Sequence, residues 1–387
     1  MGVKGDKFPL QGRGTESLVG LLRHRHFSGV NASYGKTLQE VEPEAKTDWL
    51  ALTATGRSPV LLKENNMIIV TGGAGFIGSN IVKAFNEKGR SDILIVDNLG
   101  ESEKYKNLLG IKFADYVDKH DFLHNVMDGV YDDAKIDAIF HEGACSDTME
   151  YNVNYIVKNN FEYSKLLLGY AMEREIPFFY ASSASTYGMG ENGFTEKDEC
   201  ENALNPYAFS KLIFDRYVKN ILPRAKSQIV GLRYFNVFGP QEYHKNKMAS
   251  VFYHFYNQIK ENGEARLFKG AGVTEDGEQR RDFVYVKDIV NVNMWCFENR
   301  EIKGIFNAGT GIAHSYNDAA AAVIKAMGKG SVTYIDFPEV LRGKYQFYTQ
   351  SDNTKLLKAG YNKGFYDFDE AVKEYVDLLD KGGYFKY

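Results

Sequence analysis

The sequence predicts an α/β protein built on a doubly wound parallel sheet. From Met67 onward, short apolar runs rich in β-branched and aromatic residues alternate with amphipathic stretches. Such alternation is typical of βαβ units, in which helices cover both faces of a parallel sheet. A glycine-rich turn, TGGAGFIGSN at 71–80, joins the first apolar run to the first amphipathic stretch, as at the first βα turn of such folds.

The expected strands follow one another along the chain. They are MIIV at 67–70, DILIVDN at 92–98, DAIFHEGA at 137–144, IPFFYASS at 176–183, SQIVGLRYFNVFG at 227–239 and GIFNAGT at 304–310. Helical patterns lie between them, for example NIVKAFNEKG at 80–89 and SKLLLGYAMERE at 164–175. The crossovers should be right-handed. After Pro240 the pattern becomes irregular, which indicates that a smaller C-terminal domain interleaves with the last strands.

The glycine-rich turn predicts a dinucleotide site of the Rossmann type. Gly72, Gly75 and Gly78 permit a tight turn and let backbone amides approach a pyrophosphate at a helix N-terminus. Asp97 ends the next expected strand, where an acid that binds the adenosine ribose belongs. Asp97 alone would indicate NAD, whereas Lys104 and Lys119 in the following segments could pair with the 2′-phosphate of NADP or be surface lysines.

Three regions are expected along the chain. Residues 1–66 are mixed polar and weakly periodic, so they should form an N-terminal extension that is disordered or not native to the fold. Residues 67–235 should form the NADP-binding Rossmann domain. Residues 236–387 should form mainly a substrate-binding domain, with late strands that return to the Rossmann sheet.

The composition excludes several classes of partner. The chain of 387 residues has a formal net charge of −4, which gives no electrostatic reason to expect nucleic acid or an anionic membrane as partner. No apolar run reaches the roughly 20 residues of a membrane helix. The three cysteines, Cys145, Cys200 and Cys296, show no CxxC spacing, which predicts a reducing compartment without a disulfide or zinc site. A cytoplasmic protein is therefore expected.

A serine, a tyrosine and a lysine predict proton-transfer chemistry. Ser183 ends an expected strand, at the edge where open α/β sheets bind ligands. In NPYAFSK at 205–211, Tyr207 and Lys211 lie one helical turn apart, so the lysine ammonium can favour the tyrosine phenolate. Tyr207 could then take a proton from an alcohol while a hydride leaves the same carbon. Tyr187 is either a second aromatic wall or, more simply, a buried structural tyrosine.

The histidines do not predict a metal site. His141 and His244 are far apart in sequence and lack a companion at metal-ligand spacing, so core or surface positions explain them better. Hydride transfer also requires no metal.

Several motifs together resemble a known superfamily. TGGAGFIGSN, the strand before Ser183, YAFSK and RYFNVFGP are similar to the extended short-chain dehydrogenases/reductases, whose members act on nucleotide sugars. Within that superfamily, HEGACSDT, RYFNVFGPQEYHKNKMASV, RRDFVYVKD and KYQFYTQSD resemble the family of ADP-L-glycero-D-manno-heptose 6-epimerases. The similarity covers residues 67 to 380.

The resemblance implies a redox-neutral epimerisation. NADP would oxidise C-6 of the heptose in ADP-D-glycero-β-D-manno-heptose, the keto sugar would reorient, and reduction from the other face would give the L-glycero product used in the lipopolysaccharide inner core. Tyr207 and Lys245 would be the two acid/base groups, because one base cannot easily serve both hydroxyl orientations. Relatives assemble as homo-oligomers, and the same is expected here.

The resemblance also assigns residues to the two ligands. The three glycines and Lys245 would contact the cofactor. So would Phe76, Ile77, Asp97, Asn98, Lys104, Lys119, Glu142, Gly143, Ala144, Cys145, Ser146, Asn159, Lys211 and Val237. The ADP-sugar would contact Ser183, Asn236, Lys247, His254, Phe268, Arg281 and Tyr345. The chain departs from the family pattern at Lys247, where a small hydroxyl residue is usual, and in the extended GVTEDGEQ segment at 272–279.

Other functions remain open from the sequence. A UDP-sugar 4-epimerase of the same superfamily would not need Lys245. A dehydratase commonly carries Asp-Glu beside its catalytic serine, whereas Ala184, Ser185 and Thr186 follow Ser183 here. A non-catalytic NADP-binding protein would not need the intact set of Ser183, Tyr207, Lys211 and Lys245.

Overall fold

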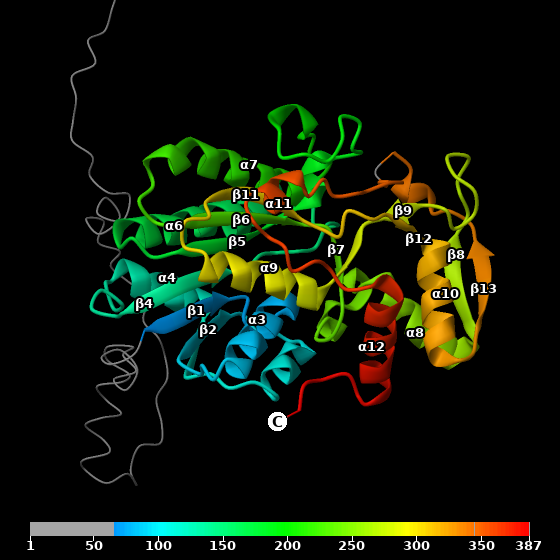
Figure 1. Ribbon diagram of the computed structural model, residues 1–387, viewed down its shortest axis with the longest axis horizontal. Coiled ribbons are helices and arrows are strands. Elements are labelled where there is room, and N and C mark those ends of the chain that lie inside the picture. The colour runs from blue at the N-terminus through cyan, green and yellow to red at the C-terminus, as the bar shows by residue number, and fades with distance from the viewer. Residues whose placement is uncertain (1–65, 344, 387) are drawn as a thin grey trace, which may run out of the picture.

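A seven-stranded, wholly parallel sheet forms the centre of the fold (Figure 1). The computed structural model describes residues 66–343 and 345–386, so the expected extension lies, except for Asn66, outside the described residues. The sheet has the order β11-β6-β5-β4-β1-β2-β3. Its strands are β1 (Met67–Thr71), β2 (Ile93–Asp97), β3 (Asp115–Asp118), β4 (Ile136–His141), β5 (Phe178–Ser183), β6 (Ile229–Tyr234) and β11 (Gly304–Ala308).

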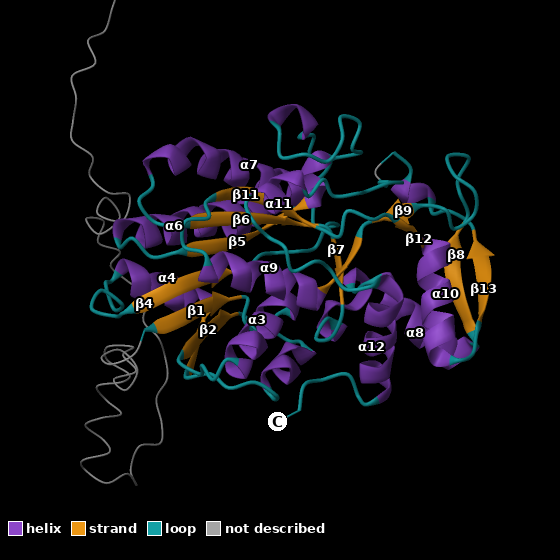
Figure 2. Cartoon of the chain, in the orientation of Figure 1, coloured by secondary structure: helices purple, strands orange, loops and turns teal. Residues whose placement is uncertain are grey.

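Helices cover both faces of this sheet (Figure 2). They are α3 (Phe76–Glu87), α9 (Val286–Glu298) and α11 (Thr354–Lys358) on one face, and α4 (Lys119–Met127), α6 (Tyr163–Glu173) and α7 (Pro206–Ile221) on the other. Side chains alternate along each strand: in β1, Ile68 and Val70 join the core under α3 and α9, whereas Met67 and Ile69 join the core under α4 and α6. Both faces are therefore apolar, which confirms the predicted doubly wound α/β fold.

A smaller lobe packs beside the sheet (Figure 1). Its core lies between a parallel pair of strands and three helices, and includes Phe238, Phe252, Leu267 and Val323. The elements of this lobe are β7 (Asn236–Phe238), α8 (Val251–Asn262), β8 (Glu264–Phe268), β9 (Arg280–Arg281), β10 (Phe283–Tyr285), β12 (His314–Ser315), α10 (Tyr316–Met327), β13 (Ser331–Ile335) and α12 (Phe368–Asp380).

Before Pro240, the structure differs from the expected strand pattern in two places. The run 227–239 is divided into β6 and β7, because the backbone leaves the main sheet after Tyr234 and β7 pairs with β10 instead. The strand β3 has no counterpart among the expected runs, because its sequence DYVD is short, acidic and only half buried. Within the described part of the chain, no helix is long and apolar enough to span a bilayer.

Candidate functional site

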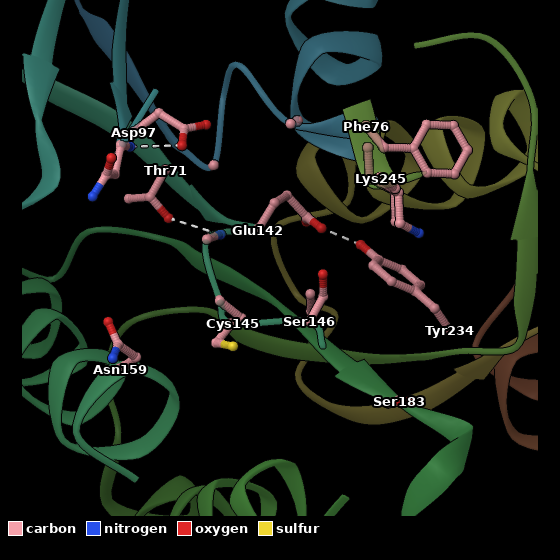
Figure 3. Close-up of a pocket in the computed structure, with 18 of the residues that line it drawn as sticks. Thr71, Phe76, Asp97, Glu142, Cys145, Ser146, Asn159, Ser183, Tyr234 and Lys245 are labelled. Atoms are coloured by element: carbon pink, nitrogen blue, oxygen red, sulfur yellow. Dashed lines mark hydrogen bonds between the residues drawn. The ribbon is translucent and has the colours of Figure 1, made fainter. Parts of the chain in front are cut away.

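A pocket of about 430 Å³ opens at the carboxyl ends of the central strands (Figure 3). Both lobes contribute to it, because the strand ends carry Asp97, Glu142 and Ser183 while Lys245 comes from the 3₁₀ turn η6 (Tyr243–Met248). Every residue predicted to be catalytic or to contact the cofactor lines this one pocket: Gly72, Gly75, Phe76, Ile77, Gly78, Asp97, Asn98, Lys104, Lys119, Glu142, Gly143, Ala144, Cys145, Ser146, Asn159, Ser183, Tyr207, Lys211, Val237 and Lys245.

The glycine-rich turn needs its glycines for two physical reasons. Gly72 has a φ of +68°, and a β-carbon there would lie 2.7 Å from the backbone nitrogen of Gly143. A β-carbon on Gly78 would lie 2.2 Å from the carbonyl oxygen of Gly72. The turn is therefore packed tightly between β1, β4 and α3, and the N-terminus of α3 faces the pocket. This cradle fits a pyrophosphate, which backbone amides and the helix dipole stabilise.

Charged groups mark the end of the pocket beside β2. The Asp97 carboxylate accepts hydrogen bonds from the backbone amides of Ala74 at 2.9 Å and Asn98 at 2.7 Å. Lys104 Nζ donates to Asp97 Oδ1 at 2.9 Å and to the Asn98 carbonyl at 2.9 Å. Lys119 Nζ donates to Asn159 Oδ1 at 2.7 Å. This end of the pocket thus combines the acid that the sequence predicts to bind the ribose with two lysines that can face a phosphate.

The predicted Tyr207–Lys211 pair lies on the first two turns of α7. Asn205 caps this helix by accepting a 2.8 Å hydrogen bond from the Ala208 amide, and Pro206 occupies its first position, where proline is favourable. Ser183 ends β5 opposite them, and its Oγ accepts hydrogen bonds from the amide and hydroxyl of Ser185. The three side chains of the predicted catalytic group therefore meet at one strand end.

Burial shifts the proton affinities of this group. Burial raises the pKa of Tyr207, and a hydrogen bond with the Ser183 hydroxyl lowers it in part. Burial lowers the pKa of Lys211 to about 8, against the opposing effects of the Glu142 and Asp215 carboxylates. Lys211 Nζ also donates to the Ala181 carbonyl at 2.8 Å. A lysine that titrates near neutral pH beside a tyrosine is typical of an acid/base site.

Lys245 reaches the same pocket from the smaller lobe. Its Nζ lies 5.3 Å from the centre of the Phe76 ring, as Figure 3 shows for the two neighbouring side chains. Burial lowers the pKa of Lys245, while the Glu242 carboxylate opposes this effect. The next residue, Asn246, has a φ of 49°, so the turn that carries Lys245 is conformationally constrained.

Glu142 and Tyr234 form a contact that the sequence did not predict. Tyr234 Oη donates to Glu142 Oε1 at 3.0 Å (Figure 3). The same Oη accepts from Asn293 Nδ2 at 2.9 Å. Burial raises the pKa of Glu142 to about 7, although Tyr234 and Lys211 lower it in part.

The pocket also contains other residues that were not predicted to contact a ligand: Thr71, Val96, Tyr155, Tyr163, Ala181, Ser182, Tyr234, Phe235 and His244. No local motif points to these residues, because chain segments far apart in sequence bring them together.

The predicted sugar-nucleotide residues lie, apart from Ser183, outside this pocket. The Arg281 guanidinium lies 4.8 Å from the centre of the Tyr345 ring, and Phe337 joins the rings of Tyr345 and Phe268. These side chains form one aromatic and basic cluster in the smaller lobe. Asn236 accepts a 3.3 Å hydrogen bond from Thr349, next to the same loop. The remaining two predicted residues lie elsewhere in this lobe, His254 on α8 and Lys247 on η6.

The structure also shows where Tyr187 and the two histidines considered as metal ligands lie. Tyr187 is buried and donates to Asn307 Oδ1 at 2.6 Å, so it is a structural tyrosine and not a wall of the pocket. His141 is buried between Thr71 Oγ1 at 2.6 Å and Ser164 Oγ at 2.7 Å. His244 lines the pocket next to Asn107. Within residues 66–343 and 345–386, no group of three histidine, cysteine or acidic side chains could hold a metal ion.

Known proteins resemble this chain in sequence and structure. Residues 68–309 match the NAD dependent epimerase/dehydratase family. The chain is 52% identical over 319 residues to ADP-L-glycero-D-manno-heptose-6-epimerase of Brachyspira hyodysenteriae, a match that covers 82% of this chain and 99% of that protein. It is 31% identical to the solved Helicobacter pylori ADP-L-glycero-D-manno-heptose-6-epimerase, with a TM-score of 0.70, covering 82% of this chain and 97% of that one.

A more distant structure has the same fold. UDP-glucose 4-epimerase of Thermus thermophilus, solved in complex with NAD, is 25% identical, with a TM-score of 0.66 over 81% of this chain and 99% of that chain. Because the family match spans most of the chain and the relative from Brachyspira is matched over nearly its whole length, the chain belongs to the NAD dependent epimerase/dehydratase family and, within it, to the ADP-L-glycero-D-manno-heptose-6-epimerases.

Proposed function

We propose that the protein converts ADP-D-glycero-β-D-manno-heptose to ADP-L-glycero-β-D-manno-heptose by transient oxidation and re-reduction at C-6. The observation that carries this proposal is the 52% identity over 99% of a protein of that name. The site agrees with it, because Ser183, Tyr207, Lys211 and Lys245 all line a pocket whose glycine-rich cradle fits a dinucleotide. The family name and the NAD-bound relative support a nicotinamide cofactor.

We infer that the cofactor is NADP and not NAD. Asp97 already accepts two backbone amides and the Lys104 ammonium, so its charge is balanced by the protein. The Lys104 ammonium beside it offers a positive charge to a 2′-phosphate, and Lys119 lies on the next strand-to-helix turn. A phosphate is held best by such fixed cationic donors.

The first half-reaction uses the Tyr207 side of the pocket. The bound nicotinamide would supply the hydride acceptor and, later, the hydride donor. Tyr207, whose pKa the Ser183 hydroxyl lowers against the larger effect of burial, takes the proton from the C-6 hydroxyl as the hydride leaves that carbon. The Lys211 ammonium and the cationic nicotinamide ring would favour the phenolate form that this step requires. The proton and hydride lost from the alcohol leave a ketone at C-6.

The second half-reaction uses the Lys245 side. After the keto sugar has rotated, its C-6 oxygen points away from Tyr207, and the Lys245 ammonium donates a proton to it while hydride returns to the opposite face of C-6. The position of Lys245 beside Phe76 and on η6, a different element from the α7 helix that carries Tyr207, supports this division of roles. The buried ammonium is also easier to deprotonate than a lysine in water, since burial lowers its pKa.

The proposal also covers the assembly and the cellular location of the protein. We expect a homo-oligomer in the cytoplasm, where the product would serve lipopolysaccharide inner-core synthesis. Light scattering of the purified protein tests the assembly, and a monomeric mass would contradict it.

The first experiment follows the C-6 configuration by NMR. Purified protein is mixed with ADP-D-glycero-D-manno-heptose without added nicotinamide. Conversion to an epimer mixture, with no net change in absorbance at 340 nm, would support the reaction and an internally recycled cofactor. If no conversion occurred even with NADP and NAD supplied, the substrate would be wrong, and UDP-sugars would be tested next.

A further inference from the structure

Three successive turns of helix α7 hold the end of strand β5. Tyr207, Lys211 and Asp215 are spaced four residues apart, so they share one face of the helix. Tyr207 lies close enough to Ser183 for the serine hydroxyl to lower its pKa, and Lys211 Nζ donates to the Ala181 carbonyl at 2.8 Å. Asp215, on the third turn, contacts Tyr180 and Ser182, which alternate with Ala181 and Ser183 along β5. This stripe of three residues on α7 contacts β5 at three successive helical turns and so fixes the position of the helix along the strand.

Asp215 has the densest set of contacts in this stripe. Its carboxylate accepts hydrogen bonds from Tyr180 Oη at 2.9 Å, Ser182 Oγ at 2.8 Å and Arg233 Nε at 2.8 Å. Asp215 and Arg233 are both fully buried. Arg233 also forms an ion pair with the buried Glu201 carboxylate. A buried ion pair adds little net stability compared with apolar packing, so a role in fixing one geometry is the better explanation for this pair.

We propose that Asp215 is a positioning residue of the site: its hydrogen bonds to Tyr180, Ser182 and Arg233 hold α7 on β5 so that Tyr207 meets Ser183. This inference rests on the proposed function, because it assigns Tyr207 and Ser183 to the reacting end of the pocket. Asp215 itself does not line the pocket. It acts through the helix that carries Tyr207 and through Ser182, the neighbour of Ser183.

The charge of Asp215 also reaches Lys211. The groups that face the Lys211 ammonium are Glu142 at the end of β4, Cys145 in the loop that follows, Asp215 on α7 itself and the buried His141 on β4. The first three raise the pKa of Lys211, against the larger effect of burial, and the Lys211 charge in turn lowers the pKa of His141. Removing the Asp215 charge leaves the Arg233 cation without one of its two anions. The loss of the Asp215 charge and the less balanced Arg233 charge both favour the neutral amine of Lys211. Lys211 should therefore lose its proton at a lower pH than in the wild type.

The test compares Asp215→Asn with a matched control. Asp198→Asn also removes a carboxylate that pairs with a residue of α7, Lys219. The Asp198 side chain, however, is 80% exposed. In Asp215→Asn we expect kcat to fall by about 10- to 100-fold, because small displacements of catalytic groups are costly. KM should change by less than about threefold. The basic limb of the kcat profile should move to lower pH. Asp198→Asn should behave as the wild type in all three respects.

Two results would overturn the inference. One is a folded Asp215→Asn protein, judged by its circular dichroism and unfolding transition, with wild-type kcat and pH profile. If that variant does not fold, Tyr180→Phe decides, since it removes one hydrogen bond to Asp215 and leaves the charges in place. A kcat reduced by about threefold or more, with an unshifted pH profile, would support positioning; an unchanged kcat would overturn it.

A binding measurement separates this inference from the proposed reaction. Cofactor-free protein is titrated with NADPH by fluorescence between pH 6 and 10. The affinity should fall as Lys211 deprotonates, and this fall should occur at lower pH in Asp215→Asn than in the wild type or Asp198→Asn. The readout does not depend on the identity of the sugar. If the wild type did not convert ADP-heptose, the reaction would be wrong, while the titration would still show whether Asp215 acts on Lys211.

Discussion

Lys104 Nζ lies 2.9 Å from Asp97 Oδ1, so the acid expected to select NAD carries its own counterion. The lysine side chain is only 23% exposed, and it bridges Asp97 to the Asn98 carbonyl. An ion pair at this place changes what the strand end can bind, because a 2′-phosphate approaching a free carboxylate would be repelled. With Lys104 present, the same position can attract the phosphate.

Lys104→Ala should therefore weaken NADPH more than NADH. The loss of one charge-assisted hydrogen bond corresponds to roughly a tenfold or greater rise in the Kd for NADPH. Titration of cofactor-free protein with both nucleotides measures this. Lys106→Ala, which removes a lysine from the same turn that pairs with Glu103 and lies 5.9 Å from the centre of the Tyr384 ring, is the control. An equal loss of affinity for NADH and NADPH would contradict a role in phosphate recognition.

Gly72→Ala should destabilise the protein and release the cofactor. Gly72 combines a positive φ with the close approach of Gly143, so alanine would meet both backbone strain and a clash. We expect a loss of about 2 kcal/mol or more in the free energy of unfolding.

Gly89→Ala is the matched control, since Gly89 also has positive φ (+80°) but nothing lies within 4 Å of its would-be β-carbon. That change should cost about 1 kcal/mol and leave cofactor bound. Urea unfolding and the absorbance of bound nucleotide give both quantities, and similar losses in the two variants would argue against the packed turn.

Lys245→Met and Tyr207→Phe should each abolish most epimerisation while cofactor stays bound. Removing a group that moves a proton in the transition state typically costs about 100- to 10,000-fold in kcat. Lys363→Met, at an exposed loop position, should have no effect. The NMR assay of C-6 configuration follows all three variants. Near-normal turnover in Lys245→Met would show that Tyr207 alone serves both faces of the carbon.

Arg281→Lys should raise KM for the ADP-sugar with little change in kcat. Arg281, predicted to contact the ADP-sugar, is buried against the Tyr345 ring and donates to the carbonyls of Arg280 and Gln346. A lysine would lack the planar fork that can bind two diphosphate oxygens. We expect KM to rise by about tenfold. Arg280→Lys alters the neighbouring, exposed arginine, which pairs with Glu278, and should leave KM unchanged. A reduced kcat with unchanged KM in Arg281→Lys would place this residue at the reacting end instead.

The sequence predicted the features that depend on neighbours in the chain. The glycine turn, Asp97 and the Tyr207–Lys211 pair are local patterns, and the structure brings them into one pocket. The pairing of Glu142 with Tyr234, and of Lys245 with Phe76, joins distant segments and has no local signal. The strand β3 was missed because its half-buried DYVD lacks an apolar run. Asp215 was missed because an aspartate within a helix usually faces solvent, whereas the buried Arg233 on β6 compensates it here.

The buried His141 should make the folded protein sensitive to acid. Its two ring nitrogens contact the hydroxyls of Thr71 and Ser164, and burial, assisted by the charge of Lys211, lowers its pKa to about 3. The unfolded chain binds a proton near pH 6.5 and the native state does not until about pH 3. Between these values the unfolded state holds more protons, so this contribution to stability is complete above pH 6.5 and is lost as the pH falls.

At pH 5 the loss from His141 amounts to about 2 kcal/mol. The free energy of unfolding in urea, measured at pH 7 and pH 5, should therefore fall by about 2 kcal/mol more in the wild type than in His141→Gln, which cannot be protonated. The comparison uses the difference between the two pH values, so any constant loss caused by the substitution cancels. His120→Gln, at an exposed position on α4, should keep the wild-type difference. If His141→Gln kept it as well, other groups would cause the acid sensitivity, and the buried hydroxyl contacts would have to accommodate the charged ring.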